Sequence, residues 1–221
     1  MSFRARREVA IGLGAYAAYL LVRRRVWTEP GRARACSNGR RVLELERRLG
    51  IAVEGGVESC ALREPRLVHA LDIAYGALNV GLTVGVLIAL YRRRDGEFHR
   101  LRRRVVAAHA GALPVFLVFP VAPPRAVRDA ADPAPAVGRL NLDHPLLVRF
   151  YNPVAALPSQ HLSLAVVTGS ALAARAGGRL GRMAARSYPA VVALVVVATG
   201  NHYVVDVAAG AALGALALHV P

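Results

Sequence analysis

Charged residues in this chain are confined to the connections between long apolar stretches, and this segregation limits the fold more than any other feature. Residues 67–91, 105–121 and 203–220 each come close to the roughly 20 mostly apolar residues that a spanning helix needs. Hydrophobic residues make up 55% of the chain but aromatic residues only 6%, so Ala, Val and Leu supply most of the apolar surface, as in lipid-facing helices. The pattern predicts helices that cross a membrane.

Three further apolar stretches are shorter, and they bring the expected number of spans to six. They cover residues 9–22, 159–176 and 183–199, and the first extends to Trp27 if its arginines reach back to the head groups. Arginines rather than a small-residue cleavage site follow this first stretch, which is typical of an uncleaved signal anchor. The predicted fold class is all-α: a polytopic six-transmembrane-helix bundle forming a single membrane-embedded domain over residues 1–221.

Between the first two spans, apolar residues recur at helical spacing. Val42, Leu45, Leu49 and Val53 would lie on one face of a helix, with charged residues on another. This pattern fits an interfacial amphipathic helix. It fits equally well a helix that packs on the protein's own loops, and both interpretations stay open.

The distribution of arginine predicts which side of the membrane each connection occupies. Connections 92–104 and 175–187 carry seven and four arginines, so the positive-inside rule places them in the cytoplasm. The loop 120–158 and the turn 200–202 then face outward, with the plasma membrane as the expected location. The stretch 23–66 is also expected outside despite its arginines, because long stretches weigh less in this rule.

The net charge is +15, because 29 arginines and no lysine stand against 14 acidic residues, and this charge would by itself suggest a nucleic-acid partner. Because the arginines cluster between apolar stretches, anionic head groups explain them instead, and we expect membrane lipids and no nucleic acid as partners. The oligomeric state is not predicted. Cys36 and Cys60 lie in the polar stretch after the first span, where either a disulfide or two free thiols is compatible with the sequence.

Two segments that contain histidine are predicted to meet at the outward ends of the spans. His161 begins the fourth expected span, whereas His202 and Asp206 begin the sixth. His202 and Asp206 are four residues apart, so on a helix the carboxylate would hold the proton of one ring nitrogen and leave the other with a lone pair. His202 is therefore the candidate nucleophile, and His161 the candidate general acid.

The same outward face offers groups that bind an anion, above all phosphate. The amides of Ser159 and Gln160 are exposed at a helix start. Arg125 follows two prolines at the outer end of the third span, and its guanidinium can bind phosphate through two hydrogen bonds. Weaker candidates lie in the same loop: Arg128, Arg139 and Arg149.

Each of these residues also has a structural explanation. Asp206 would then only cap its helix or pair with a basic residue, and Arg125 would only anchor the interface. A zinc site of His161, His202 and Asp206 is conceivable, but no further ligand is evident, so neither a metal nor another cofactor is expected. Ordinary interfacial side chains are the expectation for the other histidines: His69, His99, His109, His144 and His219.

These motifs resemble those of the type 2 phosphatidic acid phosphatase superfamily, which pairs a Pro-Ser-Gly-His segment with a later His-x-x-x-Asp. Here residues 158–161 read Pro-Ser-Gln-His and residues 202–206 read His-Tyr-Val-Val-Asp. Further similarity, to the branch that contains the inositol phosphotransferases and the fungal inositol phosphorylceramide synthases, lies in residues 45–51, 119–125, 152–159 and 199–203. Together the resemblance spans about residues 38–212, the expected catalytic core.

The resemblance implies that His202 attacks phosphorus, Asp206 orients it, His161 protonates the leaving group, and a phosphohistidine passes to water or to an alcohol, without a metal. The chain departs from the superfamily pattern in three ways. It lacks the lysine of the first motif, it has Val196 where an arginine usually precedes the histidine by six residues, and it has Gln160 in place of a glycine.

Three functions are compatible with these features. The first is a membrane-bound lipid phosphatase that cleaves a lipid phosphoester or pyrophosphate through a phosphohistidine at the extracytoplasmic face. The second is an inositol-type phosphotransferase that moves a phospho-head-group to an acceptor hydroxyl. The third is a non-catalytic lipid-binding membrane protein that has lost turnover together with its missing phosphate contacts.

Overall fold

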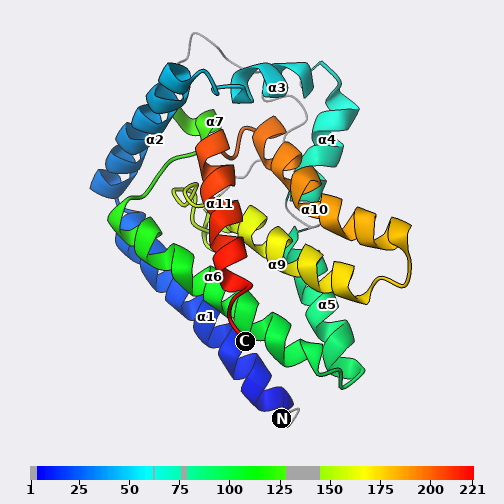
Figure 1. The fold of residues 1–221 in the computed structure, drawn as a ribbon. Helices are drawn as coiled ribbons and strands as arrows, with labels where there is room; N and C mark the ends of the chain where they lie inside the picture. Colours follow the sequence, from blue (N-terminus) through cyan, green and yellow to red (C-terminus); the bar gives the residue numbers. More distant parts are fainter. Residues whose placement is uncertain (1–3, 62, 76–78, 128–144) are drawn as a thin grey trace.

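The structure is a computed structural model, and it describes residues 4–61, 63–75, 79–127 and 145–221. Within these ranges the chain is helical and contains no strand, apart from one isolated bridge between Val121 and Ala155 (Figure 1), which confirms the all-α prediction. The helices are α1 Ala5–Val26, α2 Glu29–Leu49, α3 Glu54–Ala61, α4 Pro65–Ile73, α5 Asn79–Arg92, α6 Glu97–Val118, α7 Pro124–Val127, α8 Pro145–Val148, α9 Gln160–Arg175, α10 Arg179–Ala198 and α11 Val204–Ala217.

The long helices follow the predicted apolar stretches, with one exception. Residues 67–91 were expected to form a single span, but they lie in two helices, with α4 ending at Ile73 and α5 beginning at Asn79. Residues 76–78 between these two helices lie outside the described residues, so the single span over residues 67–91 stays a prediction.

One helix of the described chain, α10, has both the length and the apolar composition to cross a membrane. Shorter apolar helices cover Val80–Arg92 and Val204–Ala217. Few residues of the α10 span are buried within the protein, and large side chains such as Val191 and Leu194 are exposed. Apolar exposure on this scale indicates a surface that lipid or another protein covers. The six-span bundle stays a prediction.

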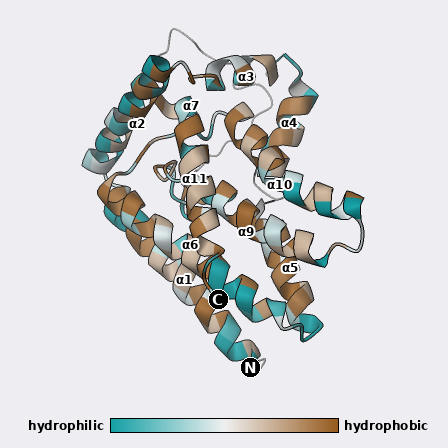
Figure 2. Ribbon diagram, viewed as in Figure 1, coloured by the Kyte–Doolittle hydropathy of each residue, from teal (hydrophilic) through white to brown (hydrophobic). Residues whose placement is uncertain are grey.

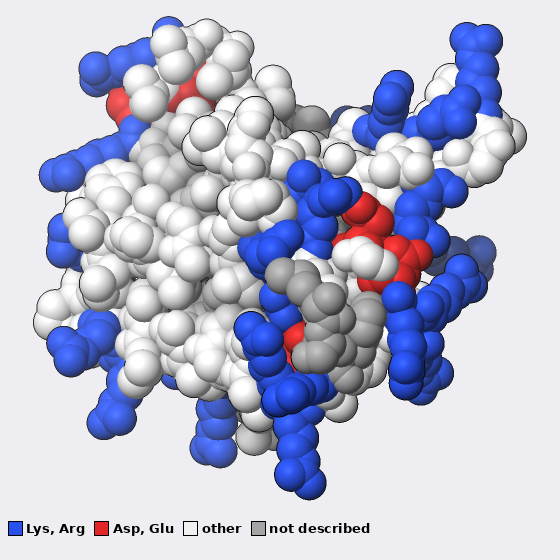
Figure 3. Space-filling view, turned by 60° about the horizontal axis from the view of Figure 1, so that its bottom comes forward, with Lys and Arg blue, Asp and Glu red and all other residues white. Residues whose placement is uncertain are grey.

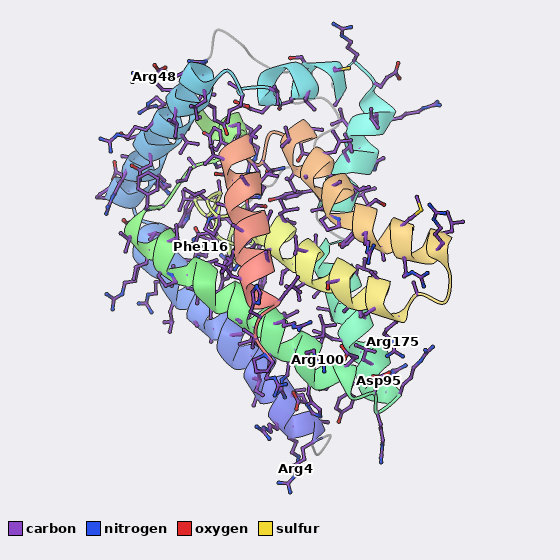
Figure 4. The ribbon with its side chains drawn as sticks, in the orientation of Figure 1. Arg4, Arg48, Asp95, Arg100, Phe116 and Arg175 are labelled. Carbon is purple, nitrogen blue, oxygen red and sulfur yellow. The ribbon has the colours of Figure 1, made fainter. Side chains whose placement is uncertain are left out.

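Hydrophilic residues gather at the ends of the long helices (Figure 2), for example at the N-terminal end of α1 and at the connection from α5 to α6. Asp95 in that connection pairs with Arg175 at the end of α9, with 2.6 Å between the carboxylate oxygen and the guanidinium nitrogen (Figure 4). The two connections predicted to be cytoplasmic therefore lie at the same end of the molecule. Figure 3 shows that face with arginines spread across it.

The opposite end joins the two segments that were predicted to face outward. The amide of Arg125 donates to the carbonyl of Gly200, and the ring of His202 contacts the carbonyl of Ala156. The loop after α6 and the turn between α10 and α11 thus meet. The six-span prediction requires this, because it places both segments on the same side of the membrane.

Helix α2 contains the predicted amphipathic segment, but its inward face differs from the predicted one. Ala35, Gly39, Val42 and Glu46 are buried, and this face packs against α7 and the segment before it. Leu45 and Leu49, expected on the same face as Val42, are instead exposed. The pattern failed because the buried face includes a glutamate, which a hydrophobic periodicity counts as polar.

Close packing of α11 on α9 sets the position of the site. A β-carbon at Gly210 would lie 2.4 Å from the carbonyl oxygen of Ser159, and one at Gly214 would lie 2.8 Å from that of Ser163. Small residues let two helix backbones approach in this way. The amide of Ser159 also donates to the carbonyl of Asp206 at 3.0 Å, which fixes the start of α9 beside the start of α11.

Cys36 on α2 is half-buried and Cys60 on α3 is exposed, and both thiols are free. Of the two alternatives that the sequence left open, the structure therefore has the pair of unbridged cysteines.

Candidate functional site

His202 and Asp206 make contact through the cap of a helix. Helix α11 begins at Val204 with Tyr203 as its N-cap, so His202 precedes the helix and does not share a helical face with Asp206. The carboxylate Oδ2 of Asp206 accepts the amide N–H of Tyr203 at 3.0 Å and lies 3.3 Å from Nδ1 of His202. The predicted contact is present, but its cause is the capping arrangement.

The surroundings of His202 fix its tautomer. Nδ1 lies 2.9 Å from the carbonyl oxygen of Ala156 as well as 3.3 Å from the carboxylate of Asp206. Both oxygens are acceptors, so Nδ1 must carry a proton to bind either of them. In the neutral ring the lone pair is then on Nε2. This nitrogen has the electronic state that a nucleophile needs.

His161 lies in the first turn of α9 and faces His202 across the site. The two ring centroids are 5.8 Å apart, with the planes at 64°. On its other side, His161 stacks on Tyr75 with 4.3 Å between the ring centroids. The structure therefore brings the two predicted histidines together, from α9 and from the segment before α11, and Tyr75 limits how the His161 ring can rotate.

Arg125 on α7 is held at the same site by two contacts with the turn that precedes His202. Its Nε donates to Oδ1 of Asn201 at 2.9 Å, and its backbone amide donates to Gly200. Asn201 is itself held, because its Nδ2 donates to Oγ1 of Thr199 at 2.9 Å. Among the weaker candidates, Arg149 is exposed and does not line the cavity at this site, and Arg128 and Arg139 lie outside the described residues.

Ser159 and Gln160, both expected to offer amides to phosphate, have different surroundings. The Ser159 amide is engaged with the carbonyl of Asp206, its hydroxyl caps α9 by accepting from Leu162, and the residue is fully buried. Gln160 lines the cavity and is the first residue of α9, where backbone N–H groups have no partner within the helix. The geometry thus supports an anion contact at the backbone amide of Gln160 and a capping role for Ser159.

A cavity of about 700 Å³ connects these groups. Its polar part is formed by His161, His202, Arg125, Asn201 and Gln160, together with His109 and Asp72. The remaining wall is largely aromatic and aliphatic and includes Tyr16, Tyr19, Tyr75, Ile73, Val80, Phe150, Tyr151 and Leu164. A mostly apolar cavity with a few convergent polar groups is typical of a ligand site.

The sequence prediction missed several residues of this site. His109 was expected to be an interfacial side chain, yet it lines the cavity and its Nδ1 lies 3.0 Å from Nε2 of Gln160. Its position inside an apolar stretch was a signal, because ionisable groups within membrane helices are usually functional. Tyr75 and Asn201 carried no comparable signal. His144 lies outside the described residues.

Three buried glutamates lie close behind the site. Glu46 of α2 is fully buried, and its Oε1 accepts the amide N–H of Val205 at 2.6 Å, in the first turn of α11. Glu54 and Glu58 of α3 are also buried, and a β-carbon at Gly200 would lie 2.7 Å from Glu58 Oε1. Burial, together with the negative charges of Glu54 and Asp206, raises the pKa of Glu46 to about 7. Glu46 therefore holds the helix that carries Asp206.

In the part of the chain that the structure describes, no group of three or more His, Cys, Asp or Glu side chains is arranged to hold a metal ion. Metal-independent chemistry stays a prediction. Val196, the position at which the resemblance led us to expect an arginine, is buried in an apolar cluster with Leu162 and Val192 and does not line the cavity.

The fold and the site define a helical protein with a histidine–aspartate pair and a second histidine at an apolar cavity. A family model described as the PAP2 superfamily matches residues 40–220, which is most of the chain. The chain therefore belongs to the PAP2 superfamily, and this membership suggests phosphatase or phosphotransferase activity. Comparison with curated proteins and with solved structures found no match. The match does not distinguish the inositol phosphotransferase branch.

Proposed function

We propose that the chain is a membrane-bound lipid phosphatase that forms a phosphohistidine on His202. The observation that carries this proposal is the environment of the His202 ring. Two acceptors hold the proton on Nδ1, and the ring lines a cavity that it shares with His161 and Arg125. A nucleophile, an acid and a fixed cation in one cavity are the groups that phosphate transfer requires.

The first step proceeds by attack of His202 Nε2 on phosphorus. A P–N bond forms, the P–O bond to the leaving group breaks, and the leaving oxygen takes a proton from His161. Asp206 stabilises the positive charge that develops on the His202 ring. The guanidinium of Arg125 and the backbone amide of Gln160 bind the phosphate oxygens. In the second step an oxygen nucleophile attacks phosphorus, the P–N bond breaks, and His161 takes back a proton.

The cavity favours a substrate that is both anionic and apolar. Arg125 and the two histidines lie at its polar part, whereas Tyr16, Ile73, Val80 and Phe150 on the remaining wall are exposed at the protein surface. A phosphate bound near His202 would thus leave its hydrocarbon chain against apolar side chains that continue to the surface of the bundle. This arrangement supports a lipid phosphate or lipid pyrophosphate as substrate.

The proposal places the site at the extracytoplasmic face of the plasma membrane. The arginine-rich connections at residues 92–104 and 175–187 lie at the other end of the molecule, joined by the Asp95–Arg175 ion pair. By the positive-inside rule that end belongs in the cytoplasm.

A second candidate function is phosphotransfer to an alcohol. A cavity of about 700 Å³ has room for an acceptor molecule beside a lipid head group, and the resemblance to the inositol phosphotransferase branch favours the same reaction. Both functions use the phosphohistidine and differ only in the nucleophile of the second step.

The test uses purified protein in detergent with a panel of lipid phosphates, with and without alcohols and with a chelator. Wild type should release phosphate and take up radiolabel from a lipid donor, and His202→Ala should do neither, with activity at least 10³-fold lower. His69→Ala is the matched control, because His69 is exposed and lies outside the cavity. Activity that survives in His202→Ala would refute the proposal and favour another nucleophile, and loss of activity in chelator would refute a metal-free mechanism.

A further inference from the structure

The side chain of Gln160 is oriented by a hydrogen-bond chain that begins at α1. Nε2 of His109 lies 3.1 Å from the carbonyl oxygen of Ala15, which can only accept, so Nε2 carries a proton. In the neutral ring Nδ1 is then an acceptor. The atom of Gln160 that lies 3.0 Å from Nδ1 must therefore be the amide nitrogen, which fixes the orientation of the carboxamide.

The ring of His109 is itself confined. It lies 5.7 Å from the ring of Tyr19, measured between centroids, and the Tyr19 hydroxyl accepts the amide N–H of Asn152 at 2.6 Å. Tyr19 and His109 both line the cavity. The support for Gln160 is thus built from α1, α6 and the segment before α9.

The carboxamide oxygen of Gln160 is left without a hydrogen-bond partner among the described residues, whereas its nitrogen is engaged by His109. Gln160 lines the same cavity as its chain neighbour His161. A fixed acceptor in the cavity that also contains the acid–base histidine is unexpected in a site for an anion, because a carbonyl oxygen repels phosphate oxygens. It suits a group that donates a hydrogen bond.

The second chemical step supplies such a donor. After His161 has protonated the leaving group, its ring is neutral and is an acceptor for the attacking hydroxyl. A water molecule has two O–H groups, so it can donate one to His161 and the other to Gln160. The hydroxyl of a simple alcohol has only one, and His161 needs it.

We propose that Gln160, held by His109, orients the water that hydrolyses the phosphohistidine, and that the chain is therefore a hydrolase rather than a transferase. This inference rests on the proposed function. The water oxygen forms the new P–O bond, the P–N bond to His202 breaks, and one water proton passes to His161. Gln160 accepts a hydrogen bond throughout and takes no proton, so it is a positioning residue.

The experiment follows formation and breakdown of the labelled enzyme separately in Gln160→Met, whose side chain has a similar length but no amide. Labelling by a radiolabelled lipid phosphate should proceed at nearly the wild-type rate, because the backbone amide is retained. Release of label to water should slow about tenfold. With glycerol present, the ratio of transfer to hydrolysis should rise several-fold.

His109→Phe provides a second variant that keeps an aromatic ring but removes both nitrogens. Like Gln160→Met, it should slow the release of label to water, because the Gln160 carboxamide is then free to rotate. Two outcomes would overturn the proposed role of Gln160: slower labelling of Gln160→Met with unchanged release of label, or a fall in transfer to glycerol as large as the fall in hydrolysis. Neither outcome would contradict the phosphohistidine on His202. Wild type that takes up no label would instead refute the proposed function, and the inference with it.

Discussion

At the scale of single residues, the position of one proton defines the chemistry of the site. Asp206 holds His202 from within a helix cap, through the same oxygen that binds the Tyr203 amide. The spacing of the two residues predicted that they meet. Spacing could not show that the Ala156 carbonyl also contacts Nδ1, because Ala156 lies 46 residues away in the chain.

Glu46 gives a prediction about pH at this scale. Its folded pKa of about 7 exceeds the ordinary 4.5, so the folded state keeps the proton over this range while the unfolded state releases it. The contribution of Glu46 to stability is therefore fully present below pH 4.5 and is lost as the pH rises through 7. Glu46→Gln should flatten the fall in melting temperature between pH 4.5 and 7, because glutamine keeps the acceptor for Val205 without a charge.

The measurement is thermal unfolding of the protein in detergent across that pH range. Glu44→Gln is the matched control, because Glu44 is exposed on the same helix and, among the described residues, forms an ion pair only with Arg48 at the surface. Exposed pairs of this kind contribute about 0–1 kcal/mol. If the melting temperatures of wild type and Glu46→Gln depend on pH in the same way, Glu46 is ionised in the folded protein over this pH range, and the prediction is wrong.

At the scale of elements, the contact between α9 and α11 decides whether the two histidines meet. Gly210→Ala should force the helices apart, because its β-carbon would lie 2.4 Å from the carbonyl oxygen of Ser159, which is backbone and has little freedom to move. A displacement of about 1 Å can cost around 10²-fold in rate, so turnover should fall by that order while some folded protein remains.

Gly81→Ala is the control for this substitution. Gly81 lies in α5, and a β-carbon there would meet nothing within 4 Å. Alanine favours a helix over glycine by about 1 kcal/mol, so this variant should be at least as stable as wild type and fully active. Kinetics and melting temperature of the two variants measured together check the prediction. An active Gly210→Ala protein would show that the close approach of the helices is not needed.

At the scale of the whole molecule, helix α1 contributes both to the cavity and to the packing at the other end. α1 precedes the residues matched by the family model, yet its Tyr16 and Tyr19 line the cavity. Its N-terminal half is tied to α6 by the ion pair of Glu8 with Arg102, whose nearest oxygen and nitrogen atoms are 2.6 Å apart. This chain therefore completes its site with a helix from outside the matched region.

The orientation of the molecule is testable through its cysteines. Cys60 is exposed on α3, so an impermeant thiol reagent should label it on intact cells if that end faces outward; half-buried Cys36 should react more slowly. Cys60→Ser should remove most of the label. In that background Gly177→Cys, at the exposed connection between α9 and α10, should react only after permeabilisation. The reverse pattern would place the site in the cytoplasm.

The sequence by itself determined the helical class, the approximate positions of most long helices, and the two histidines and the aspartate that the structure brings together. These follow from local information: apolar length, the position of prolines and glycines, and the spacing of a few polar side chains. The buried face of α2 was not predictable in this way, because burial of a glutamate depends on what packs against it.

Only the tertiary structure decided how those residues function together. The tautomer of His202, the engagement of the Ser159 amide, the contact of Glu46 with α11 and the orientation of Gln160 each depend on a partner far away in the chain. Hydrogen bonds act over about 3 Å. A pattern in the sequence names the donors and acceptors, and the fold alone brings particular ones within that distance.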